Sequence, residues 1–141
     1  MPITLTVTEG LLAPAVEAQV FAGLTEALLE IEQLDGNAFM EPNVIGTVNV
    51  VPPGRVYTGG KPGTAAFVEL KLPGVALATP EAKGRFIARA TDVVERAAEG
   101  RLARDHIWVN VVYAADGAWG IAGRSYDNDA LVDAISSAAV Q

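Results

Sequence analysis

The chain has 141 residues, half of them hydrophobic, and a formal net charge of −7. This composition is typical of a compact fold and argues against disorder, and an acidic surface repels the phosphates of nucleic acids. With no cysteine and one histidine, His106, the sequence excludes a disulfide framework and any metal site built from thiolates or several imidazoles.

The first half of the chain predicts a strand, a helix and two more strands. Met1–Pro2 leads directly into an alternating segment, Ile3–Val7, which predicts the first strand. Pro14 suits the first turn of a helix, and apolar residues then recur at steps of three and four up to Ile31. We expect Asp35–Gly36 to end this helix. The next predicted strands cover Gly46–Val51 and Ala66–Leu72.

The second half predicts a helix, a strand and a short final helix. Thr79 offers a hydroxyl N-cap with Pro80 at the first helical position, and Gly100 offers a stop. A strand follows over Ile107–Val112. Asp127–Asn128 predicts the cap of the last helix.

An internal repeat relates the two halves. Val48–Val51 recurs as Val109–Val112, and Gly59 recurs as Gly120 at the same spacing. We therefore expect one α+β domain over residues 1–141, made of two β-α-β units at about 1–62 and 63–126 plus the short C-terminal helix. Each unit makes its strands parallel, so the units form a four-stranded mixed sheet with both helices on one face.

The alternation assigns the side chains to the two faces of this sheet. One face is wholly apolar and must pack on the helices, whereas the other mixes large aromatic residues with polar ones. The members of the mixed face include Pro2, Phe67, Lys71, Trp108 and Asn110. Because such a face would expose aromatic rings to water, we expect another subunit to cover part of it.

Pro2 carries the main chemical suggestion. Initiator methionine is normally removed before proline, which leaves a secondary amine at the start of a strand. An unperturbed α-amino group has a pKa of about 7.7–8.0, and partial burial lowers this value toward neutrality. A general base works best there, so Pro2 is a candidate base.

These features resemble the tautomerase superfamily, in particular the cis-3-chloroacrylic acid dehalogenase group. The shared pieces are Pro2, Leu12 with Pro14, Phe67–Val68, Lys83–Gly84, His106–Val109 and Gly123–Arg124. The stretch from Val48 through Gly59–Gly60 to Gly74 is also similar to macrophage migration inhibitory factor. The resemblance implies an amino-terminal proline that acts as base and acid, on a tandem β-α-β fold that assembles as a homotrimer.

The chain departs from this resemblance at four dehalogenase positions. Leu28 stands where that family has a histidine, Pro73 opens the segment that should hold two arginines, and Ile121 replaces a glutamate. The family's active-site tyrosine falls at Asn110. Without these groups, hydrolytic dehalogenation and hydration are disfavoured.

Five further residues are candidates for the site, each with a structural alternative. Asn110 would donate a hydrogen bond to a developing oxyanion, or its side chain is a hydrogen-bonded polar group of an inner strand. Trp108 would form a wall of the pocket, or it anchors a subunit interface. Arg124 and Lys71 would bind a substrate carboxylate, or else make surface ion pairs, Lys71 with Glu69. Tyr57 would reach the site of an adjacent subunit.

The leading hypothesis is a cytoplasmic homotrimeric tautomerase that acts on a small anionic 2-oxo acid without cofactor or metal, and binds neither nucleic acid nor membrane. A lyase that uses the same proline on a small unsaturated or 3-oxo acid (a decarboxylase, hydratase or dehalogenase) is an alternative, with Asp116 or Glu69 as the water-activating acid. A non-catalytic trimeric binding protein, in which Pro2 only seals the strand, is the third.

Overall fold

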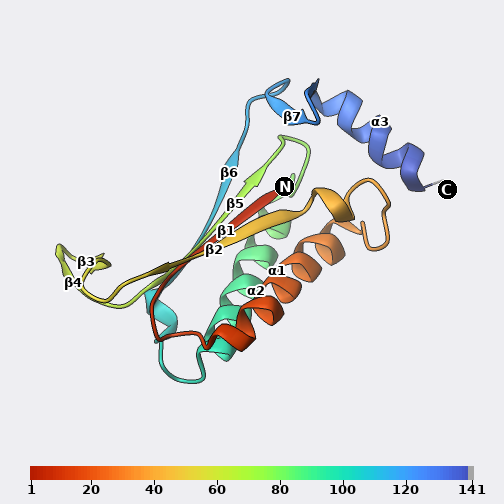
Figure 1. The fold of residues 1–141 in the computed structure, drawn as a ribbon. Helices are drawn as coiled ribbons and strands as arrows, with labels where there is room; N and C mark the ends of the chain where they lie inside the picture. Colours follow the sequence, from red (N-terminus) through yellow and green to blue (C-terminus); the bar gives the residue numbers. More distant parts are fainter. Residues whose placement is uncertain (140–141) are drawn as a thin grey trace.

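A twisted sheet covered on one side by two helices forms the body of the protein (Figure 1). The computed structural model describes residues 1–139. In the order β2-β1-β5-β6, β1 pairs parallel with β2 and antiparallel with β5, and β5 pairs parallel with β6. The four strands are β1 (Pro2–Thr8), β2 (Ile45–Val51), β5 (Ala66–Leu72) and β6 (Ile107–Tyr113). The predicted pair of β-α-β units and their mixed sheet are confirmed.

The two crossover helices are α1 (Glu17–Glu32) and α2 (Pro80–Ala98), and both lie on the same face of the sheet (Figure 1). Helix α2 begins as predicted, since Oγ1 of Thr79 accepts a hydrogen bond from the amide of Ala82 at 3.1 Å. Both helices end before the glycines that were expected to stop them. Gln33 and Glu99 adopt positive φ angles of 57° and 50° and close the last turns.

The core lies between the helices and the inner face of the sheet. Strand β5 alternates strictly between buried and exposed residues, as the sequence predicted. Leu5, Leu70 and Phe86 are fully buried there. Each such side chain contributes about 1.5–3 kcal/mol to stability by leaving water, which makes this face the main source of cohesion.

The outer face of the sheet is open in the single chain. Phe67 and Trp108 stack with their ring centroids 5.6 Å apart, and they remain 36% and 41% exposed. Ile45 and Val112 on the same face are 58% and 40% exposed. Exposed aromatic and aliphatic side chains on one sheet face are typical of a surface that meets another protein.

A short hairpin follows the second strand of each repeat, and the sequence patterns predicted neither hairpin. The first joins β3 (Tyr57–Thr58) to β4 (Lys61–Pro62), and the second joins β7 (Trp119–Ile121) to β8 (Arg124–Tyr126). Helix α3 (Asn128–Ala139) follows the second hairpin, and Oδ1 of Asp127 caps it by accepting from the amide of Ala130 at 2.8 Å. None of the helices described over residues 1–139 has the length and apolar character needed to cross a bilayer.

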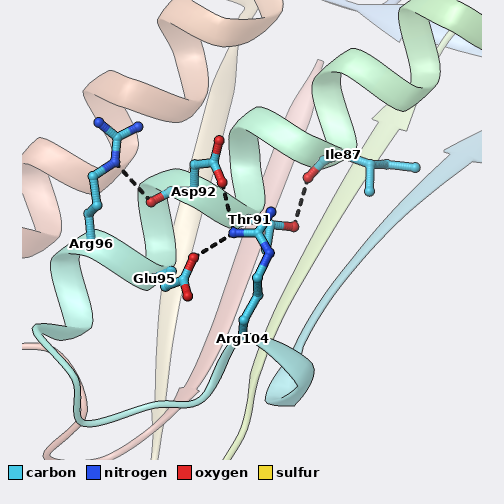
Figure 2. Close-up of polar contacts among 6 residues, drawn as sticks. All are labelled: Ile87, Thr91, Asp92, Glu95, Arg96 and Arg104. Atoms are coloured by element: carbon cyan, nitrogen blue, oxygen red, sulfur yellow. Dashed lines mark hydrogen bonds and ion pairs between the residues drawn. The ribbon is translucent and has the colours of Figure 1, made fainter.

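Ion pairs join the exposed side of α2 to the turn before β6. Arg104 contacts Asp92 at 2.7 Å and Glu95 at 2.5 Å, and Figure 2 shows its guanidinium reaching both carboxylates. Arg96 on the same helix donates to the backbone carbonyl of Asp92. The exposed charges on α2 therefore also hold the turn that leads into β6.

Gly46 on β2 is a point where the packing admits no side chain. A Cβ atom there would lie 2.5 Å from the carbonyl oxygen of Ile3 and would overlap the ring of Phe21. We expect Gly46→Ala to lower the free energy of unfolding by about 1–3 kcal/mol through overpacking. Gly84→Ala is the matched control, because Gly84 is exposed within α2 with no neighbour near its Cβ position.

The control should raise stability by about 0.5–1 kcal/mol, since alanine favours a helix over glycine. Urea unfolding of both variants measures the two effects. Equal stability of Gly46→Ala and the parent chain would contradict the packing described for β1, β2 and α1.

Candidate functional site

A hollow of about 460 Å³ opens at the N-terminal end of β1. Strand pairing sets its geometry, because Pro2 lies opposite Ile45 and the Ile3–Leu70 register brings Lys71 beside Pro2 on the outer face. The β7–β8 hairpin closes the other side with Trp119. The residues that line it are Met1, Pro2, Asn43, Ile45, Lys71, Ala114, Ala118, Trp119, Gly120 and Ile121.

Pro2 is the first residue of a central strand, a position that tolerates proline. A proline inside the strand would remove a ladder hydrogen bond, but at the first position this loss is small. The strand is nevertheless fixed at this point, since the amide of Ile45 donates to the carbonyl of Met1 at 3.3 Å. The start of the chain is therefore held by the sheet.

Met1 is buried, with 5% of the residue exposed. Its terminal amine donates a hydrogen bond to the backbone carbonyl of Asn43. Burial lowers the pKa of this amine from 8.0 to about 6, because the low-polarity surroundings disfavour the charged form. While Met1 is attached, the nitrogen of Pro2 is a peptide nitrogen and has no basicity.

Lys71 brings a positive charge to the hollow. Its Nζ lies 3.9 Å from Oε1 of Glu69, and both side chains are about half exposed. An exposed pair at that distance is worth at most about 1 kcal/mol, so it competes only weakly with an anion that enters the hollow.

The structure places the other predicted site residues at different distances from Pro2. Asn110 pairs with Glu69, which pairs with Thr4, so Asn110 lies two strands across and two residues along from Pro2. Sheet spacings put it roughly 12 Å away. Trp108 lies still further along β6, stacked on Phe67.

The remaining two candidates lie on the hairpins. Tyr57 is 59% exposed on β3, and this hairpin projects from the end of the sheet opposite the N-terminus (Figure 1). Arg124 pairs opposite Ile121 on the hairpin that borders the hollow, but its guanidinium lies over the ring of Tyr126, 4.7 Å from the centroid. Within one chain, therefore, the structure brings Lys71 alone of these candidates into the hollow that holds Pro2.

The positions that differ from the dehalogenase group have separate surroundings. Ile121, which stands at the position of the dehalogenase group's glutamate, lines the hollow with Pro2. The hollow therefore has an apolar side chain at this position. Leu28 is fully buried in the core. Asp116 accepts a hydrogen bond from the amide of Asn128 at 2.7 Å, at the start of α3. In the described part of the chain, no three acidic or histidine side chains gather as a metal site would require.

Sequence reasoning missed Trp119 and Glu32. Trp119 lines the hollow from β7, a strand too short to show a period, and the nearest signal in the sequence was the recurrence of Gly59 as Gly120. Glu32, the last residue of α1, lines a smaller cavity beside the hollow. Its place on the polar side of the helix pattern gave no signal of this.

Comparison with solved structures finds the same fold in many chains. N1, a member of the cis-3-chloroacrylic acid dehalogenase family, is 14% identical with a TM-score of 0.74, and the match covers 100% of both chains. Pt0534, in a structure inactivated by 2-oxo-3-pentynoate, is 16% identical over 93% of this chain and 98% of that chain, with a TM-score of 0.73.

A fused 4-OT described as a symmetric trimer is 16% identical over 93% of this chain and 98% of that chain, with a TM-score of 0.74. No protein-family profile and no curated protein matches the sequence. At these identities the likeness establishes a shared fold, and it confirms the tandem β-α-β architecture that the sequence predicted.

The buried terminal amine allows a direct test of the site's polarity. In a chain that retains Met1, obtained by inhibiting methionine aminopeptidase during expression, NMR titration of ¹³C-labelled Met1 should give a midpoint at about 6. The folded state favours the neutral amine, so between pH 6 and 8 the unfolded chain binds more protons and stability rises with pH. The control is the same chain in urea, and an equal midpoint in both states would contradict the burial of the amine.

Proposed function

We propose that this chain, whose fold is that of the tautomerase superfamily, is a tautomerase that interconverts the enol and keto forms of a small 2-oxo acid. The Pro2 amine, freed by removal of Met1, acts as base and acid. The observation that carries this proposal is the position of Pro2, fixed at the first residue of a central strand and lining a hollow beside Lys71.

Keto–enol interconversion requires little more than one amine held beside the substrate. The neutral Pro2 amine takes the enol proton, and the resulting ammonium returns a proton to the substrate carbon as the carbonyl forms. The burial that lowers the pKa of the Met1 amine supports this role, because Pro2 is the next residue and lines the same hollow. An amine that titrates near neutrality has the balance of base and acid strength that proton transfer needs.

Lys71 is proposed to hold the substrate carboxylate. A carboxylate beside Lys71 would direct the rest of the molecule over Pro2, at a cost limited to the weak contact with Glu69. Arg124 is a second carboxylate-binding candidate, since its hairpin borders the hollow and its exposed side chain forms no ion pair among residues 1–139, lying instead over the ring of Tyr126.

We further propose a homotrimer whose neighbouring subunits complete the site. The exposed Phe67–Trp108 stack offers an apolar surface for a second copy, and the symmetric trimer of the fused 4-OT supports this number. Asn110, Trp108 and Tyr57 lie away from Pro2 of their own chain, so any part they play as oxyanion donor, wall and cross-subunit contact requires such neighbours.

Replacing Pro2 tests the proposed function. After mass spectrometry confirms that Met1 is absent, ketonisation of phenylenolpyruvate and 2-hydroxymuconate is followed by ultraviolet absorbance. We expect Pro2→Ala to lower kcat/KM at least a hundredfold, since a positioned general base is worth about 10²–10⁴. Pro14→Ala, outside the hollow, is the matched control and should retain activity.

Equal rates for the parent chain and Pro2→Ala would show that any ketonisation does not use this amine. Absence of activity in the parent chain with both substrates would reject the tautomerase assignment for these 2-oxo acids and favour a lyase or a non-catalytic trimer.

A further inference from the structure

A small, partly closed cavity of about 50 Å³ adjoins the Pro2 hollow. The end of α1, the turn before β2, the segment after β5, β7 and α3 border it. Apart from Glu32 and Asn43, its walls are apolar. The lining residues are Met1, Glu32, Leu34, Met40, Asn43, Pro73, Val75, Ala76, Trp119, Ile121, Leu131 and Ile135.

This cavity shares walls with the hollow. Met1, Asn43, Trp119 and Ile121 line both spaces. Met1, a residue 5% exposed, is itself part of the partition. We expect removal of Met1, which the proposed function requires, to join the cavity to the hollow, since it vacates the volume of an unbranched apolar side chain on their shared wall.

Glu32 places a fixed carboxyl group on the wall of this space. Its Oε1 accepts a hydrogen bond from the amide of Leu77 at 2.9 Å. The loop that carries this amide is fastened in turn, since the hydroxyl of Tyr113 donates to the carbonyls of Ala76 and Leu77 at 2.8 and 2.9 Å. Among residues 1–139 no cation forms an ion pair with Glu32.

The surroundings of Glu32 are unfavourable for negative charge. Burial raises the pKa of its carboxyl group, and the hydrogen bond from Leu77 offsets this only in part. A second carboxylate in the same apolar space would meet both the loss of hydration and the repulsion of Glu32. An uncharged apolar group would instead replace the contacts that Met1 leaves behind.

We propose that this cavity receives the non-reacting end of the substrate and that Glu32 determines specificity there, admitting an uncharged apolar substituent and rejecting a second carboxylate. This inference rests on the proposed function of Pro2, and it narrows the substrate class to 2-oxo monocarboxylic acids with an apolar tail. Lys71, on the outer face, then faces the single carboxylate.

The test measures two substrates with the parent chain, with Glu32→Gln and with a control variant. The parent chain should turn over phenylenolpyruvate, which has one carboxylate and an aromatic tail, with at least tenfold higher kcat/KM than the dicarboxylate 2-hydroxymuconate. Glu32→Gln keeps the acceptor for Leu77 and removes the charge. It should raise the ratio of kcat/KM for 2-hydroxymuconate to kcat/KM for phenylenolpyruvate at least tenfold.

Glu30→Gln is the matched control, because Glu30 lies on the same helix and pairs with Arg89 at 2.6 Å on the exposed side. It should leave the ratio of the two kcat/KM values unchanged. An unchanged ratio in Glu32→Gln, with both substrates still turned over, would overturn the role of Glu32 while the proposed function of Pro2 stands.

A binding measurement keeps the inference testable if turnover is absent. Calorimetric titration with cinnamate and trans,trans-muconate should show tighter binding of cinnamate to the parent chain. Glu32→Gln should bind muconate at least tenfold more tightly than the parent chain does. Should Glu32→Gln fail to fold, Glu32→Met removes the same charge and is expected to act in the same direction. Equal affinity of the parent chain and the folded variant for muconate would overturn the proposal.

Discussion

The architecture depends on the pairing of β1 between two neighbours from its first residue. Pro2 lies opposite Ile45 on one side, and the antiparallel register with β5 fixes the other. Chain termini are usually mobile, whereas this one is held in a sheet and borders a hollow. The same pairing decides which side chains share the outer face, and so brings Lys71 next to Pro2 and sets Asn110 apart.

Polarity is divided between the two sides of this anchored terminus. Lys71 brings a cation on the outer, solvent-facing side, and the inner side is an apolar cavity with a single carboxyl group, Glu32. An amine between them is poorly hydrated, which explains why the pKa of the Met1 amine falls to about 6. In the proposed function, this arrangement orients an anionic substrate with its charge outward and its apolar part inward, and removal of Met1 both frees the amine and clears space.

Most of the fold could be read from the sequence because the strands alternate and the helices repeat at three and four residues. The hairpins could not, since strands as short as Tyr57–Thr58 contain no period. Within the site, the alternation of the strands alone predicted that Pro2 and Lys71 lie on the same face of the sheet. Trp119 and Glu32 were not, because their place at the hollow and its cavity is set by the long-range packing of β7, α1 and the Leu77 loop.

The central claim is that the freed Pro2 amine is the reactive group, and covalent labelling tests it most directly. The alkynyl 2-oxo acid 2-oxo-3-pentynoate, with which the similar Pt0534 was inactivated, reacts with nucleophilic amines. Peptide mass spectrometry of the treated, Met1-free protein should place one adduct on the N-terminal peptide at Pro2, with loss of activity in proportion. No adduct, or an adduct confined to Lys71 or another side chain, would contradict the account.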